Sequence, residues 1–301
     1  KDNGEIKKVT SDVATFTVKK AERTITIGNL NKIFDNNPIA DIRSKVEING
    51  TTIQDQDTLE DNYYEDNNGE IGNPLPSGTI LSKPGTYWVE VKIAADKNYK
   101  AASASKKFTI SYLPTPEKPY TLKVNNSEVQ NREWYKDNVI IEPASGYEII
   151  DSTYSTGNDG FISISKDNPG KHNINFYLQQ NGTNYITDKI SVLVNIDIKN
   201  PKGTIQIQQE NSWDDWHELS DNKYFKEAQN VIISGTDEES GVDTISYFCS
   251  SEKYTLDEID ETKWKRYEGA FSLTPESNYI IYVRITDKAG NSFYLNSDKL
   301  V

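Results

Sequence analysis

Short runs in which apolar and polar residues alternate recur along the whole chain. Clear examples are residues 24–27, 87–93, 161–164 and 280–285. Because successive side chains of a strand point to opposite faces of a sheet, each run predicts a half-buried β-strand. Apolar residues at helical spacing are almost absent, and the one candidate is a single turn at residues 255–260, which Thr255 can cap. The pattern therefore predicts an all-β protein.

Turn-forming residues separate the predicted strands at short intervals. Asparagine, glycine and proline cluster at residues 49–50, 84–85, 168–170, 181–182 and 289–291. These residue types adopt the backbone angles of tight turns at little cost. Many short strands with regular turns favour β-sandwiches over units that alternate strands with helices.

Two breaks in the strand pattern divide the chain into modules. Three of the seven residues at 113–119 are prolines, which cannot pair inside a sheet and form a stiff, extended spacer. A second break falls at residues 198–203, after a run of strand-like residues. The parts between the breaks have roughly 80 to 110 residues, the size of one immunoglobulin-like sandwich.

The predicted domain organisation follows from these breaks. Residues 14–18 are similar to residues 105–110, so the N-terminal segment reads as the last strand of a preceding repeat or as an extension. We predict a tail strand at 1–18, sandwich domains at 19–113, 120–198 and 199–301, and a proline-rich linker at 114–119.

Composition limits the classes of partner. Hydrophobic residues make up 35% of the 301 residues, enough for small cores, and 18 tyrosines argue against disorder. The net charge of -13 repels phosphate backbones and anionic lipid, so we expect no nucleic-acid binding. No apolar run approaches the length of a transmembrane helix, and we expect no membrane insertion within this segment.

The counts of sulfur-containing residues point to the setting of the protein. A single cysteine, Cys249, permits no intrachain disulfide. Proteins secreted by Gram-positive bacteria commonly lack disulfides, so the count fits such a setting. Methionine is absent, also at position 1, so we expect a segment of a longer chain.

Several segments resemble known bacterial repeats. In the first module, residues 34–38, 85–91, 96–103 and 108–110 resemble MBG-type repeats of bacterial extracellular proteins, with Phe34 in place of the usual tyrosine and Asn36 in place of the usual glycine. The second and third modules are similar to immunoglobulin-like repeats that occur in tandem in cell-wall-anchored proteins of Gram-positive bacteria, as residues 134–141, 237–242 and 282–291 show. The resemblance implies three tandem immunoglobulin-like sandwiches in an elongated array, located outside the cell, secreted or attached to the cell wall.

The sequence offers no recognisable catalytic constellation. The two histidines, His172 and His217, fall in different predicted modules, and Cys249 lies in a strand pattern that predicts a buried, small apolar side chain. No glycine-rich phosphate loop precedes a helix. We therefore predict that the chain is not an enzyme.

Calcium is the metal ion that the acidic composition fits best. The segment 55–70 is rich in oxygen ligands but fails the spacing of an EF-hand, since Tyr64 stands where the first aspartate belongs. Asp237 and Asp287 fall on two loops that meet at one end of an immunoglobulin-like sandwich. The alternative, which we favour, is that both cap turns by accepting hydrogen bonds from backbone amides. We expect no cofactor, or Ca²⁺ on Asp237 and Asp287.

Two tryptophans near the start of the third module are candidates for ligand binding. Trp213 and Trp216 flank two aspartates and offer large flat rings on which a sugar can stack. Their spacing of three does not place them on one strand face. In the alternative, one tryptophan packs over the edge of the sandwich and the other is half-exposed.

These expectations combine into one functional prediction with one alternative. We predict a non-catalytic, monomeric spacer of a bacterial cell-surface or secreted protein, which presents another domain away from the cell wall. The alternative is an adhesin, or a carbohydrate-binding accessory module of a secreted glycoside hydrolase. Its partner is then an extracellular glycan or a host surface protein.

Overall fold

The chain folds almost entirely into β-strands. A computed structural model describes residues 17–52, 58–130, 133–208, 216–218, 227–274 and 278–297. Within these ranges the only helical segments are three short 3₁₀ turns, η1 (Ile42–Lys45), η2 (Leu256–Glu258) and η3 (Glu261–Lys263). The prediction of an all-β protein is confirmed. The turn expected at residues 255–260 is η2, and Thr255 is its N-cap.

The chain divides into two compact units. The first unit ends at Leu113 and also includes Gly182–Ile186, and the second begins at Pro114. The first unit holds one pair of sheets and the second holds two pairs. Each pair forms one β-sandwich.

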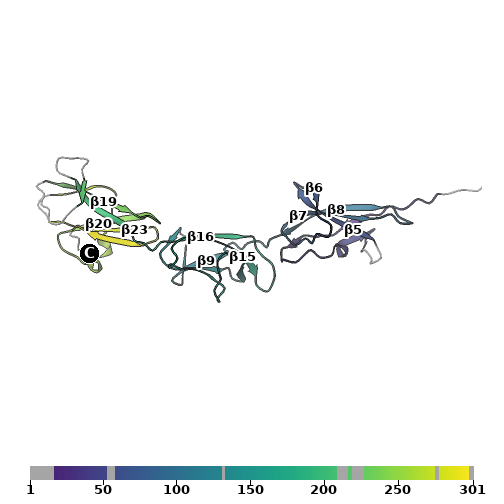
Figure 1. The fold of residues 1–301 in the computed structure, drawn as a ribbon, viewed down its shortest axis with the longest axis horizontal. Helices are drawn as coiled ribbons and strands as arrows, with labels where there is room; N and C mark the ends of the chain where they lie inside the picture. The colour runs from purple at the N-terminus through teal and green to yellow at the C-terminus, as the bar shows by residue number, and fades with distance from the viewer. Residues whose placement is uncertain are drawn as a thin grey trace, which may run out of the picture. The chain divides into compact units, whose positions relative to one another are not determined.

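The first sandwich combines a three-stranded and a five-stranded sheet. The smaller sheet has the order β1-β3-β4 and the larger the order β2-β8-β7-β5-β6. Figure 1 shows β5, β6, β7 and β8 of the larger sheet. The strands are β1 (Ile25–Ile27), β2 (Lys32–Ile33), β3 (Val46–Ile48), β4 (Thr51–Thr52), β5 (Leu59–Asn67), β6 (Glu70–Pro74), β7 (Gly85–Ile93) and β8 (Ala102–Ser111).

Alternating residues of this sandwich build its core. Val89 and Val91 of β7 are fully buried, and they flank Glu90, which points to the other face. The rings of Tyr63 and Tyr87 pack on Phe108 of β8 at centroid distances of 6.3 and 5.8 Å. The described residues of this core all belong to the first unit.

The second sandwich has two four-stranded sheets, of order β10-β9-β12-β14 and β11-β16-β15-β13. Phe176, Ile174 and Val194 are fully buried in its core. The short strand β11 runs parallel to β16, as β2 runs parallel to β8 in the first sandwich. The strands are β9 (Tyr120–Val124), β10 (Ser127–Val129), β11 (Trp134–Tyr135), β12 (Val139–Pro143), β13 (Tyr147–Ile150), β14 (Ile162–Ile164), β15 (Gly170–Gln180) and β16 (Ile190–Ile196).

The third sandwich pairs the sheet β18-β17-β19-β22 with the sheet β21-β20-β23-β24. Its core is centred on Val231 of one sheet and on Ile281, Val283 and Ile285 of the other, all nearly or fully buried. The strands are β17 (Lys202–Gln208), β18 (Trp216–Glu218), β19 (Gln229–Thr236), β20 (Val242–Ser250), β21 (Lys265–Arg266), β22 (Phe271–Leu273), β23 (Ile280–Asp287) and β24 (Ser292–Asn296).

A second apolar layer covers the outer face of the sheet that contains β20 and β23. Phe248 and Tyr282 point away from the main core and are still buried, with exposed fractions of 5% and 3%. The loop at residues 251–264 lies over them and contributes the buried Ile259 and the ring of Trp264. This strand pair is therefore buried on both faces, and the loop positions the pocket described below.

The predicted fold, three tandem immunoglobulin-like β-sandwiches, is confirmed by these three pairs of sheets, each with its own core. The tail strand predicted at residues 1–18 lies outside the described residues, except for its last two. Among the residues that the structure describes, no helix has the length and apolar character needed to span a bilayer.

Candidate functional site

Three carboxylates meet at one end of the third sandwich. Asp197 directly follows β16, Asp237 directly follows β19, and Asp287 is the last residue of β23. One oxygen from each lies within 4.8 Å of the others. Asp197 and Asp287 are buried, and Asp237 is half-buried. The structure thus brings together the two aspartates singled out in the sequence and adds Asp197, which sequence reasoning missed.

Asp237 and Asp287 both cap turns. Oδ1 of Asp237 accepts hydrogen bonds from the backbone N–H groups of Glu239 and Gly241, at 3.1 and 2.7 Å. Oδ1 of Asp287 accepts from the amides three and four residues further along, at 2.7 and 2.8 Å. The turn-capping alternative therefore describes the local role of both side chains, because each carboxylate accepts hydrogen bonds from backbone amides of the turn that follows it.

Asp197 connects the second sandwich to the third. Its Oδ2 accepts a hydrogen bond from the backbone N–H of Ser240 at 3.1 Å. Its backbone carbonyl accepts from Nδ2 of Asn291 at 2.8 Å, and the same Nδ2 donates to Asp287 Oδ2 at 2.8 Å. Because Asp197 ends the second sandwich and the other groups belong to the third, the carboxylate cluster lies at the junction of the two.

The donor set fits a calcium ion. Ca²⁺ takes oxygen ligands at about 2.3–2.6 Å, so oxygens on opposite sides of one ion lie about 4.6–5.2 Å apart. The spacing of at most 4.8 Å between the three carboxylate oxygens agrees with a shared ion. A carboxylate has about four lone-pair positions on its two oxygens, so a carboxylate that caps a turn through Oδ1 keeps lone pairs on Oδ2 for a cation.

The acidic segment at residues 55–70 has a different structure. Its first residues, 55–57, lie outside the described residues, and the rest includes the hairpin of β5 and β6. The carboxylate of Asp66 pairs with Lys107 Nζ at 3.0 Å and accepts from Trp88 Nε1 at 2.9 Å and from the Gly69 amide at 3.1 Å. The Lys107 ammonium, followed by the two N–H donors, holds the pKa of Asp66 below its ordinary value. Asp66 thus stabilises the hairpin.

The two tryptophan candidates are only partly described. Trp213 lies outside the described residues. Trp216 is the first residue of β18 and pairs with Gln208 at an edge of its sheet.

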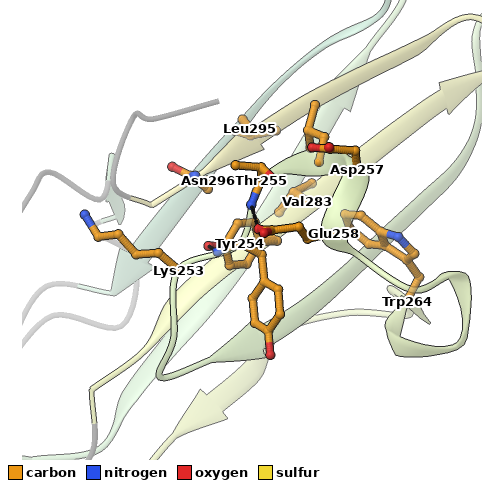
Figure 2. Close-up of a pocket in the computed structure, with 11 residues that line it drawn as sticks. Lys253, Tyr254, Thr255, Asp257, Glu258, Trp264, Val283, Leu295 and Asn296 are labelled. Carbon is orange, nitrogen blue, oxygen red and sulfur yellow. Dashed lines mark hydrogen bonds between the residues drawn. The ribbon is translucent and has the colours of Figure 1, made fainter.

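A pocket of about 510 Å³ lies beside the outer apolar layer of the third sandwich, under the loop at residues 253–258. Figure 2 shows the rings of Tyr254 and Trp264, with Glu258 between them. Tyr282 of β23 supplies a further ring from the sheet, and Val283 and Leu295 also line the pocket, although their side chains pack in the main core. Sequence reasoning missed this pocket, because it treated residues 280–285 as a strand with only one buried face.

The rings of this pocket are fixed by one another. Tyr282 stacks on Phe248 with ring planes 6° apart and centroids at 4.7 Å, and its hydroxyl accepts from the backbone N–H of Tyr254 at 2.7 Å. Trp264 meets Phe248 edge-on at 5.3 Å, and the guanidinium of Arg284 lies 4.8 Å from the centroid of the Trp264 ring. Each ring therefore has contacts that define its orientation.

Capping groups fix the loop. Glu258 Oε2 accepts from the backbone N–H of Thr255 at 2.9 Å in a capping box, drawn as a dashed line in Figure 2. This N–H bond holds the pKa of Glu258 below its ordinary value. Asp260 Oδ1 accepts from the backbone N–H of Thr262 at 2.8 Å and caps η3. The pocket is thus lined by a loop with defined backbone geometry.

The two histidines lie in different sandwiches. His172 is buried in the second, where Nδ1 lies 2.9 Å from the Tyr154 hydroxyl and Nε2 lies 2.9 Å from the carbonyl of Asn168. Cys249 is in β20 of the third sandwich, and burial raises the pKa of its thiol to about 11. His217 is in β18. A buried thiol with a raised pKa is a poor nucleophile.

Comparison with known proteins gives structural likenesses alone. No family model matches the chain, and a comparison with curated proteins yields no match. Fibronectin(III)-like modules of Clostridium thermocellum CbhA are 10% identical, with 58% of this chain and 91% of that chain covered and a TM-score of 0.29. A crystal structure of domains from titin is 11% identical, with 92% and 98% covered and a TM-score of 0.27. At this similarity neither likeness assigns a family or a function to the chain.

Proposed function

We propose that the chain is a non-catalytic spacer of a bacterial cell-surface or secreted protein, which holds another domain away from the cell wall. The observation that carries this proposal is the series of three sandwiches, each closed around its own core. A module that buries its own apolar surface adds length to a chain without needing a partner. The repeat resemblance of the sequence supports an extracellular location.

The chemistry of the described side chains supports a non-catalytic role. His172 has both ring nitrogens within hydrogen-bond distance of structural partners, and Cys249 has a raised thiol pKa. The three clustered aspartates accept hydrogen bonds from turn amides. These groups hold the fold together, which is what a spacer requires.

Small-angle scattering tests the spacer proposal. A compact 301-residue globule has a radius of gyration of about 19 Å, whereas a rod of three sandwiches about 100 Å long has one of about 30 Å. We expect the larger value from a monomer. A radius near 19 Å would contradict an extended spacer.

We also propose that Asp197, Asp237 and Asp287 bind Ca²⁺ and so stiffen the junction of the second and third sandwiches. The spacing and the oxygen chemistry of the cluster favour this second function. Asp237→Asn and Asp287→Asn keep an oxygen that caps the turn but remove a charge, so they separate calcium binding from capping.

The calcium test is a thermal melt with added CaCl₂ and with EDTA. We expect Ca²⁺ to raise the melting temperature of the chain, and both variants to lose that rise. Asp243→Asn, which changes an exposed carboxylate of the same sandwich, is the matched control and should keep it. Equal melting temperatures with CaCl₂ and EDTA would mean that the three carboxylates serve only as turn caps.

The alternative function is that of an adhesin or a carbohydrate-binding accessory module. Trp213 and Trp216 were its predicted anchors, and the side chains of these two residues are not described. The aromatic pocket of the third sandwich is the observation that favours this alternative. Its partner would be an extracellular glycan or a host surface protein.

A further inference from the structure

We propose that the aromatic pocket of the third sandwich binds a sugar ring of a neutral glycan. This inference deepens the carbohydrate-binding alternative and rests on it. It does not depend on the spacer proposal, because a spacer module can also carry a binding site.

The apolar surface of the pocket suits the C–H face of a sugar. Tyr254, Tyr282 and Trp264 of the outer apolar layer line it. Aromatic rings offer large, rigid contact area, and the contacts within the ring cluster hold them in place before a ligand arrives. Because these side chains are already ordered, binding a ligand costs less conformational entropy than it would with mobile side chains.

The polar groups of the pocket suit hydroxyl groups. The loop contributes the carboxylates of Asp257 and Glu258 and the hydroxyl-bearing residue Thr255 to the lining of the pocket. Carboxylate oxygens accept hydrogen bonds from hydroxyls, and the threonine hydroxyl can donate or accept. Figure 2 shows these side chains gathered around the pocket with the apolar ones. A few convergent polar groups on an apolar surface are typical of small-ligand sites.

Charge selects against anionic ligands. The loop at residues 251–264 carries five carboxylates and two lysines, so its net charge is negative. Phosphorylated, sulfated and sialylated ligands would be repelled by Asp257 and Glu258 at the pocket itself.

Existing contacts also select against cationic ligands. Lys263 Nζ already lies 3.9 Å from the centroid of the Tyr254 ring, and Arg284 lies 4.8 Å from that of Trp264. These two cations cover one face of each ring and add positive charge beside it, which repels a further cation. A neutral, hydroxyl-rich ligand remains the class that matches both the rings and the carboxylates.

The test is a titration of the full chain with a panel of neutral α- and β-linked oligosaccharides. Saturation-transfer NMR detects binding of each ligand. A sialylated glycan, a sulfated glycan and a lysine-rich peptide are the charged arms of the panel. We expect at least one neutral glycan to bind and the charged ligands to bind more weakly. Failure of every neutral glycan to bind, or stronger binding of a charged ligand, would overturn the proposal.

Two variants locate the site. Tyr254→Ala removes a ring and Asp257→Ala removes a carboxylate, and each should weaken neutral-glycan binding by about tenfold or more. Tyr99→Ala in the first sandwich, where Arg23 lies 4.9 Å from the ring centroid, is the matched control and should leave binding unchanged. Melting curves of each variant exclude loss of fold as the cause, and the exposed Leu256 offers Leu256→Ser as a substitute if Tyr254→Ala unfolds.

A third set of variants distinguishes this proposal from the broader alternative. If Trp213→Ala and Trp216→Ala abolish glycan binding while the pocket variants keep it, the chain binds carbohydrate at another place and the pocket assignment is wrong. Failure of the spacer proposal would instead show in the scattering radius, which none of these variants tests.

Discussion

Gly203 lies where the two sheets of the third sandwich approach each other closely. It is in β17, opposite Gly235 of β19. A Cβ atom at Gly203 would lie 2.0 Å from Cδ1 of Ile285 and 2.5 Å from the carbonyl oxygen of Ser234. Ile285 is fully buried in the core formed with the other sheet. We therefore predict that Gly203→Ala strongly destabilises this sandwich.

The size of the effect follows from the overlap. Carbon atoms in contact are normally about 3.5–4.0 Å apart, so Ile285 or the strand must move by about 1.5 Å. Overpacking of this kind costs about 1–3 kcal/mol. In a module of this length, 1 kcal/mol lowers the melting temperature by about 4–8 °C. We expect a drop of about 4–24 °C for the third sandwich.

A second substitution tests the cause. Ile285→Val removes the Cδ1 atom in the closest contact and alone costs about 0.5–1.5 kcal/mol. Combined with Gly203→Ala, it should cost less than the sum of the two single changes, by about 0.5–2 kcal/mol. Some destabilisation should persist, because the contact with Ser234 is a backbone contact that valine does not relieve.

Calorimetry of the full chain, with hydrogen exchange to assign each transition, measures these values. Gly235→Ala is the matched control, since its nearest contacts are side-chain atoms at 3.1 Å and its cost should be smaller. A Gly203→Ala chain within about 0.5 kcal/mol of the parent, or strict additivity with Ile285→Val, would refute this reasoning.

Three further predictions follow from single side chains. Phe176→Ala, at a fully buried position, should cost the second sandwich about 3–5 kcal/mol in calorimetry, and loss of exchange protection in all three sandwiches would argue against separate cores. His172→Phe should cost about 1–3 kcal/mol in denaturant titration, since it removes the partner of Tyr154 and of the Asn168 carbonyl, and a neutral effect would show that water replaces the ring. Burial raises the pKa of the Cys249 thiol from 9.0 to about 11, so iodoacetamide should react slowly at pH 8 with the folded chain and rapidly in urea. The same pKa shift means that the stability of the third sandwich declines as pH rises from about 9 toward 11, because in that range only the thiol of the unfolded chain ionises. Rapid alkylation of Cys249 in the folded chain would contradict both statements.

Most of the fold can be predicted from local patterns in the sequence. The run at residues 87–93 alternates because Val89 and Val91 face a core while Glu90 and Lys92 do not, and it is part of β7. The capped turn at Thr255 also depends only on neighbouring residues. Periodicity and capping are short-range properties, so a single sequence displays them.

The candidate sites depend on long-range contacts. Asp197 lies 40 residues before Asp237, and only the packing of the second sandwich on the third brings it to the cluster. The sequence signal for the pocket is weaker than that for the strands. Ile280, Ile281, Tyr282 and Val283 are consecutive and all buried, which indicates a strand covered on both faces, but the sequence does not say which loop covers it.

Force extension of single molecules tests the central claim, that three self-contained sandwiches follow one another in the chain. With both ends tethered, the chain should unfold in three separate steps. Each step should release roughly 300 Å of extended chain, since a sandwich contains roughly 80 to 110 residues at about 3.3–3.6 Å each. A single step that releases the whole chain at once would show that the sandwiches share one cooperative core, and it would contradict the account.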